Sequence, residues 1–216
     1  VDMKTPGIEA KPIKQISGSA NFNEVFFNDV RIPDSQRIGA EGDGWKVSLT
    51  TLMNERLAVG DPPGLDFDQI FEASKEIEVE DGLAVKNSEV RQKMADWYIQ
   101  SRGLQYTKYR SMTALSKGQT PGPELSISKL VTASKMQDVS SYALDLMDMS
   151  GMVHQDQNPI LKNLFQNGYF FSAAMRIAGG TDEVLRNIIA ERVLGLPQDE
   201  RSDKKLPFNE LPSGKN

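Results

Sequence analysis

The chain has 216 residues, no cysteine, one histidine and a formal net charge of −5. This composition excludes a disulfide framework and thiolate catalysis, leaves no room for a histidine-rich metal cluster, and argues against a nucleic-acid partner because clustered positive charge is missing. No apolar run approaches the roughly 20 residues that cross a bilayer, and no signal peptide opens the chain, so we expect a cytoplasmic protein without a membrane partner.

Residues 8 to about 38 have the character of strands. Residues 8–13 partly alternate, and residues 22–33 are rich in β-branched and aromatic side chains. Asn28-Asp29 marks a turn within the second segment. Because the chain opens at Val1 in what reads as the middle of a β region, the sequence suggests a fragment whose residues 1–40 are part of a β domain.

A helical period begins after Gly42-Asp43-Gly44. Apolar side chains and one arginine then recur at spacings of three and four on one face: Trp45, Leu49, Leu52, Met53, Arg56 and Leu57. The segment Asp61-Pro62-Pro63-Gly64 ends this helix, because proline cannot continue it. Further helical patterns follow at residues 65–77, 88–115, 123–149, 159–177 and 181–194.

The connection at residues 117–123 combines a helix stop with a helix start. Gly118 suits the end of one helix, and Pro123 suits the first turn of the next. Long helices joined by short connections bury their apolar faces most simply as an up-down bundle. The predicted fold is therefore mainly α: a helical bundle at residues 41–196 after a short antiparallel β segment, with a charged, poorly ordered tail at residues 197–216.

Two motifs carry a family resemblance. Gly179-Gly180-Thr181 precedes an amphipathic helix, and the strand-turn-strand from Phe26 to Pro33 is followed by Ile38-Gly39 and Gly42-Asp43-Gly44-Trp45. In order and spacing these motifs resemble the acyl-CoA dehydrogenases, flavoproteins that introduce an α,β double bond into an acyl-CoA thioester. The resemblance covers almost the whole chain, as the second half of the family's middle β-barrel domain and then its C-terminal bundle.

The resemblance implies a glutamate base. Many members carry it just before the Gly-Thr of the C-terminal motif, where this chain has Gly179. A second group, similar to the isovaleryl and long-chain enzymes, carries it on the earlier helix before an arginine, where this chain has Glu55 and Arg56. We therefore expect Glu55 to be the base, with Arg56 orienting or balancing it; from spacing alone, Glu55 and Arg56 are equally a surface charge pair.

The resemblance also implies ligand contacts at the C-terminal motif. Thr181 and Glu183 match positions that touch FAD, and Gly179 and Gly180 would lie beside the acyl-CoA substrate. A helix start favours phosphate through its free N–H groups, although Thr181 is also an ordinary N-cap. The family further implies fatty-acid metabolism, an electron-transfer flavoprotein as acceptor, and a homo-oligomer, dimer or tetramer, built through apolar helix faces.

Two segments depart from the family pattern. Residues 75–82 are acidic where most relatives place an arginine for the cofactor pyrophosphate of a neighbouring subunit, and Asp145 falls near the family's glutamine. Two alternatives therefore stay open: a flavin monooxygenase or nitroalkane oxidase of the same fold, and a non-catalytic assembly module or subunit of a heteromeric dehydrogenase. The 216 residues alone are expected to turn over little, since part of the family's pocket is missing.

Other conspicuous side chains are expected to be structural. Trp45 and Trp97 are predicted to anchor helix packing. Met147, Met149 and Met152 are predicted as helix core in preference to an adaptable acyl-binding wall. His154 stands in a polar connection and is expected to be solvated rather than catalytic.

Overall fold

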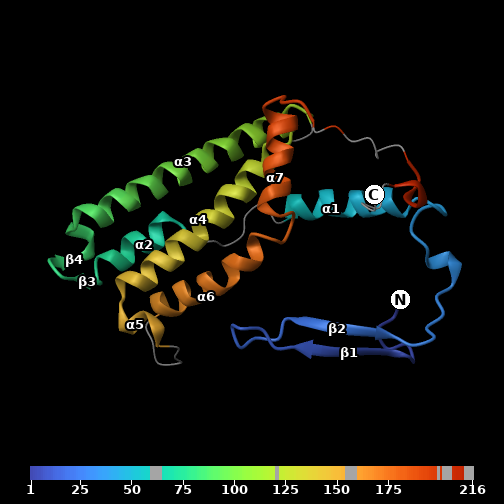
Figure 1. Ribbon diagram of the computed structural model, residues 1–216, viewed down its shortest axis with the longest axis horizontal. Coiled ribbons are helices and arrows are strands. Elements are labelled where there is room, and N and C mark those ends of the chain that lie inside the picture. The colour runs from blue at the N-terminus through green and yellow to red at the C-terminus, as the bar shows by residue number, and fades with distance from the viewer. Residues whose placement is uncertain (59–64, 120–121, 154–159, 199, 201–205, 212–216) are drawn as a thin grey trace, which may run out of the picture.

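The computed structural model describes residues 1–58, 65–119, 122–153, 160–198, 200 and 206–211. The side chains of residues 53–58, 160–162 and 208 lie outside that description. Helices dominate the chain, and the strands are confined to two short antiparallel pairs within the described residues (Figure 1). The predicted mainly α class is therefore confirmed.

A hairpin of β1 (Ile8–Ile13) and β2 (Phe22–Phe27) opens the chain, with Ile8 opposite Phe27. Every residue of both strands is exposed except Ile8, which is half-buried. The predicted turn follows β2, where Asp29 adopts φ 51°. The expected strand character of residues 28–38 was wrong: no strand follows the turn there, and a single 3₁₀ turn (Asp34–Gln36) occupies part of that segment. Among the described residues, no further strand pairs with this segment.

The helix α1 (Gly44–Ala58) begins where the change of period predicted it. The described part of its apolar stripe is not buried: Trp45 is 77% exposed, and Leu49 and Leu52 are exposed as well. The prediction that Trp45 anchors helix packing was therefore wrong. The periodic pattern identified the helix correctly, but it does not say whether another element covers the apolar face.

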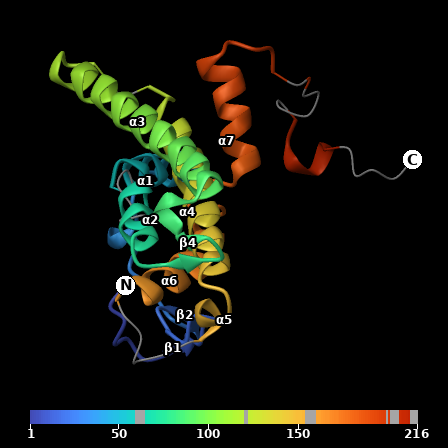
Figure 2. The same ribbon diagram turned by 90° about the vertical axis from the view of Figure 1, so that its left-hand side faces the viewer.

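The bundle consists of α2 (Phe67–Ser74), α3 (Ser88–Ser116), α4 (Leu125–Leu146) and α6 (Ile160–Met175). The long helices α3 and α4 run in opposite directions, and α4 packs between α3 and α6 (Figures 1 and 2). Their shared core holds Trp97, which is 1% exposed as predicted. The largest other fully buried apolar side chains are Phe165, Ile70, Leu185 and Val139. This arrangement confirms the predicted up-down bundle.

The helix boundaries have local causes. Asn87 caps α3 by accepting hydrogen bonds from the N–H groups of Glu89 and Val90. Gly118 adopts φ +72° directly after the last turn of α3, as predicted for a helix stop. Between α2 and α3 lies a hairpin that the sequence did not predict, formed by β3 (Glu78–Val79) and β4 (Gly82–Leu83).

The end of α4 corrects another expectation. Met147 is buried at 8% exposure, but Met149 and Met152 of the short helix α5 (Met149–Met152) are 67% and 75% exposed, so the prediction that they belong to the core was wrong. The chain breaks its helix at Asp148, which has φ 50°, and in the short helix that follows only Gly151 is buried. The predicted loop residue His154 and most of the tail lie outside the described residues.

The last α-helix of the described residues, α7 (Asp182–Ile188), packs against α4 and continues into one π-helical turn (Ile189–Val193). In the described part of the tail, a single 3₁₀ turn (Phe208–Glu210) is present. None of the helices within the described ranges is long and apolar enough to cross a membrane.

Candidate functional site

The first predicted site residues, Glu55 and Arg56, lie in the last turns of α1. Their side chains are outside the described residues, so the orientation of the Glu55 carboxylate stays a prediction. The backbone of α1 is helical through Ala58, and Glu55 therefore stands on a helix, as the sequence predicted.

The second predicted site is the turn between α6 and α7, which we call the 179–181 turn. Gly179 has φ +68° and Gly180 has φ +108°, conformations that side-chain-bearing residues rarely adopt. Thr181 is the N-cap of α7, and its Oγ1 accepts a hydrogen bond from the N–H of Val184 at 3.3 Å. The capping role predicted for Thr181 is thus confirmed.

The 179–181 turn has an open outer side. A Cβ placed on Gly179 would meet no atom within 4 Å. Among the described residues, the backbone N–H groups of Gly179, Gly180 and Thr181 donate to no protein acceptor. Free N–H groups ahead of a helix carry partial positive charge and suit an anionic ligand. The turn therefore has the shape and the donors to receive one.

Two cations hold the 179–181 turn from its inner side. The Lys129 ammonium, on α4, donates to the carbonyl oxygen of Gly180 at 2.6 Å. The Arg176 guanidinium, at the end of α6, contacts Oδ2 of Asp182 through Nε at 2.7 Å and Nη2 at 2.6 Å. Its Nη1 donates to Oε1 of Gln137 on α4 at 2.7 Å. Sequence reasoning missed Lys129 and Gln137, because no local pattern links α4 to this region of the chain about 40 to 50 positions later. It also missed the contact of Arg176 with Asp182, although Asp182 itself was recognised in the first turn of the helix.

The carboxylates beside the turn differ in their surroundings. Asp182 is 3% exposed and ion-paired, while its Oδ1 has no hydrogen-bond partner among the described residues. Glu183 is exposed, and hydrogen bonds from its own backbone N–H and from the Thr181 hydroxyl lower the pKa of its carboxyl. Glu183 is therefore an ionised acceptor at neutral pH, able to bind a hydroxyl or amine of a ligand.

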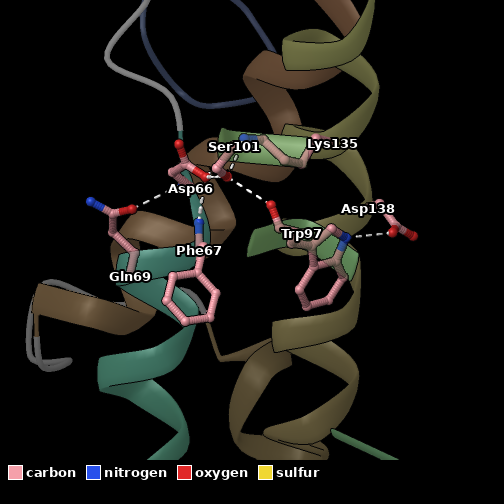
Figure 3. A network of polar contacts seen from close by, with 7 residues as sticks. All are labelled: Asp66, Phe67, Gln69, Trp97, Ser101, Lys135 and Asp138. Carbon is pink, nitrogen blue, oxygen red and sulfur yellow. Dashed lines mark hydrogen bonds and ion pairs between the residues drawn. The ribbon is translucent and has the colours of Figure 1, made fainter. Parts of the chain in front are cut away.

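A second group of polar side chains joins α2, α3 and α4 (Figure 3). The Lys135 ammonium lies 2.8 Å from Oδ1 of Asp66 and 2.8 Å from the Ser101 hydroxyl oxygen, and Ser101 also donates to Asp66. Nearby, the Trp97 indole N–H donates to Asp138 at 2.8 Å. The side chain of Lys135 is only 1% exposed. No local pattern in the sequence indicates a buried lysine on this helix.

These contacts make Lys135 a structural residue. Burial raises the pKa of the Asp66 carboxyl, but hydrogen bonds from Lys135, Ser101 and the Phe67 N–H outweigh burial and lower the pKa overall. The ion pair with Asp66 and the hydrogen bond to Ser101 supply the buried Lys135 side chain with polar partners. A groove of about 550 Å³ borders the network, with Tyr98 and Arg102 among its walls.

The bundle and the 179–181 turn also match a known protein family. The family described as "Acyl-CoA dehydrogenase, C-terminal domain" matches residues 42–194, which include α1, the bundle and the 179–181 turn. The chain belongs to the acyl-CoA dehydrogenase family. The predicted resemblance is therefore confirmed.

Similar proteins support the assignment to the acyl-CoA dehydrogenases. The chain is 34% identical over 202 residues to acyl-CoA dehydrogenase IpdE1 of Mycobacterium tuberculosis, covering 93% of this chain and 51% of the relative. It is 31% identical over 200 residues to acyl-CoA dehydrogenase FadE34 of the same organism, covering 92% of this chain and 26% of that relative. The chain thus spans between a quarter and a half of the length of these relatives.

A solved structure confirms the fold. The ChsE4-ChsE5 complex from Mycobacterium tuberculosis matches with a TM-score of 0.71 and 18% identity, over 91% of this chain and 52% of that chain. At this identity the match concerns architecture alone. It supports the helical fold described above.

Proposed function

We propose that this chain supplies the helical part of an FAD-dependent acyl-CoA dehydrogenase, which introduces an α,β double bond into an acyl-CoA thioester. Family membership supports an oxidoreductase. The observation that carries the specific reaction is the distribution of glutamates. Glu55 stands directly before Arg56 on α1, whereas the alternative position in the 179–181 turn is Gly179.

In this proposal, Glu55 removes the proton from the carbon next to the thioester carbonyl. A carboxylate in an apolar, closed site is a stronger base than one in water, because burial destabilises its charged form. Arg56 balances that charge before the proton arrives. A hydride leaves the neighbouring carbon, so the substrate loses one proton and one hydride as the C=C bond forms. FAD, when bound, would supply the hydride acceptor.

The residues present fit a phosphate-bearing cofactor at the 179–181 turn. Its N–H groups donate to no protein acceptor among the described residues, and its outer side at Gly179 is open. We propose that Thr181 and Glu183 contact FAD, and that Gly179 and Gly180 leave room for the acyl thioester. Family members generally use FAD, which supports this assignment.

The other end of the bundle does not fit the cofactor. Residues 76–81 contain Glu76, Glu78, Glu80 and Asp81, whose charges oppose a pyrophosphate. We therefore propose no pyrophosphate contact from this segment. This observation favours a second candidate function, in which the chain is a non-catalytic subunit of a heteromeric dehydrogenase; the related solved structure is itself a complex.

Membership of the acyl-CoA dehydrogenase family also suggests partners and a cellular location. We propose that the bundle assembles with further subunits as a homodimer or homotetramer, that electrons pass to an electron-transfer flavoprotein, and that the protein works in the cytoplasm. The exposed apolar stripe at Trp45, Leu49 and Leu52 supports packing against a further structural element. Because the chain spans only part of its relatives' length, we expect little turnover from the 216 residues alone.

The test uses the full-length gene product. Flavin content is read from absorbance, and dye reduction is followed over a panel of acyl-CoA thioesters for wild type, Glu55→Gln and the control Glu89→Gln, an exposed carboxylate on α3. We expect bound flavin in all three proteins and activity reduced by orders of magnitude only in Glu55→Gln. Full activity of Glu55→Gln would place the base elsewhere, and a wild type without flavin would favour the non-catalytic subunit.

A further inference from the structure

We propose that Lys129 and Arg176 are positioning residues that hold the 179–181 turn in the conformation needed by its ligand. This inference rests on the proposed function, because it assumes that cofactor or substrate meets this turn. Neither residue contacts the ligand in the proposal. Both act through the backbone and side chains of the turn.

Lys129 fixes the centre of the turn. Its ammonium donates to the carbonyl oxygen of Gly180 at 2.6 Å, a short charge-assisted hydrogen bond. Because a peptide unit is planar, holding the Gly180 carbonyl inward also sets the direction of the Thr181 N–H on the opposite side of that peptide. That N–H is one of the donors without a protein acceptor in the described chain.

Arg176 fixes the two ends of the turn. It belongs to the residues that close α6, and it reaches across the turn to Asp182 in the first turn of α7, with Nε and Nη2 on the same carboxylate oxygen. Its Nη1 is anchored on Gln137 of α4. A planar guanidinium with three fixed contacts sets both the distance and the angle between the two helices.

The turn needs such external supports. Gly179 and Gly180 have no side chains to pack, and glycine has the largest backbone freedom of any residue. The outer side of Gly179 is open, so no neighbouring atom restrains it there. A misplacement of about 1 Å in a catalytic site reduces rates about 10²-fold. Lys129 and Arg176 therefore restrain a turn whose position is expected to affect the reaction rate.

A matched pair of lysines separates positioning from folding. Lys129 and Lys75 both carry an ammonium, but Lys75 pairs with Glu72 on the exposed surface of α2, away from the turn. Lys129→Met and Arg176→Lys are the test variants, and Lys75→Met is the control for loss of one surface charge. Lys129→Arg restores a donor and tests for rescue.

The experiment uses the full-length protein and three readouts: melting temperature, hydrogen exchange of amides 177–185, and kcat and KM for an acyl-CoA turned over by wild type. We expect Lys129→Met and Arg176→Lys to speed exchange in this segment and to lower kcat/KM about 10²-fold at nearly unchanged melting temperature. Most of the loss is expected in kcat, with partial recovery in Lys129→Arg and no change in Lys75→Met.

The outcomes distinguish this inference from the proposed function. If wild type is active and both test variants keep wild-type kcat/KM, Lys129 and Arg176 do not position the site, and the inference is overturned while the proposed function stands. Faster hydrogen exchange of amides 177–185 with unchanged kcat/KM also overturns the inference, because the turn is then more mobile without any effect on the reaction. A wild type that neither binds flavin nor turns over any thioester removes the proposed function and this inference together.

Discussion

Lys135 and Asp66 form an ion pair across the bundle, with Nζ of the lysine 2.8 Å from Oδ1 of the aspartate. The two residues are 69 positions apart and join α4 to the start of α2. The lysine side chain is 1% exposed, whereas that of Asp66 is 45% exposed. The pair therefore has one wholly desolvated charge that depends on its partner.

Removal of the Asp66 carboxylate is expected to destabilise the fold. Asp66→Ala leaves Lys135 buried without its counter-charge, and we expect a loss of about 2 to 4 kcal/mol in the free energy of unfolding, below the full range for a wholly buried pair because Asp66 is half-exposed. Urea denaturation of both proteins measures this loss in the free energy of unfolding. Asp68→Ala, an exposed neighbour, serves as control and should change stability by less than about 1 kcal/mol. Equal losses in both variants would contradict the role of the pair.

The same pair predicts a dependence on pH. The folded-state pKa of Asp66 lies below its ordinary value of 3.8, since hydrogen bonds from Lys135, Ser101 and the Phe67 N–H outweigh the opposing effect of burial. A lowered pKa means that the unfolded chain binds the proton more tightly, so the stabilisation is present above about pH 3.8 and is lost as pH falls through the folded-state pKa. The stability difference between wild type and Asp66→Asn should be constant near neutrality and shrink below about pH 4. A constant difference down to pH 2 would argue against this.

The two tryptophans are expected to report opposite environments. Trp45 is 77% exposed and Trp97 is 1% exposed in the 216-residue chain. In Trp97→Phe the remaining emission should be red-shifted and readily quenched by acrylamide, whereas in Trp45→Phe it should be blue-shifted and protected. Similar quenching in both variants would show that α1 packs more closely than described.

Two glycines are expected to respond oppositely to alanine. Gly103 lies inside α3, and a Cβ added there would meet only open space, so Gly103→Ala should raise the free energy of unfolding by about 0.5 to 1 kcal/mol. Gly179 has φ +68°, so Gly179→Ala should lower it by about 1 to 2 kcal/mol. Chemical denaturation of both variants checks the signs; stabilisation by Gly179→Ala would mean that the turn is not left-handed in solution.

Local signals predicted the helices well. The sequence placed a helix at residues 88–115, and α3 spans Ser88–Ser116, because the apolar period and the glycine stop at Gly118 are both local. The two-residue strands β3 and β4 were missed, since a strand this short has no period to recognise. Trp45 and Trp97 have similar local patterns, yet only Trp97 has the partner helix α4 beside it.

The candidate site was predictable only in part. Thr181 was identified as a cap from its position before α7, and the glycine pair indicated an unusual turn. Lys129 contacts this turn, and Gln137 contacts Arg176, through tertiary packing that a single sequence does not reveal. The burial of Lys135 had no local signal for the same reason.

The most direct test of the proposed reaction follows proton removal itself. Full-length wild type, Glu55→Gln and Glu55→Asp are incubated with an acyl-CoA in D₂O, and deuterium uptake at the carbon next to the thioester carbonyl is measured by mass spectrometry. We expect exchange in wild type, slower exchange in Glu55→Asp, and a loss of about 10² to 10⁴ in rate in Glu55→Gln with flavin content unchanged. Wild-type exchange in Glu55→Gln would contradict the assignment of Glu55 as the base.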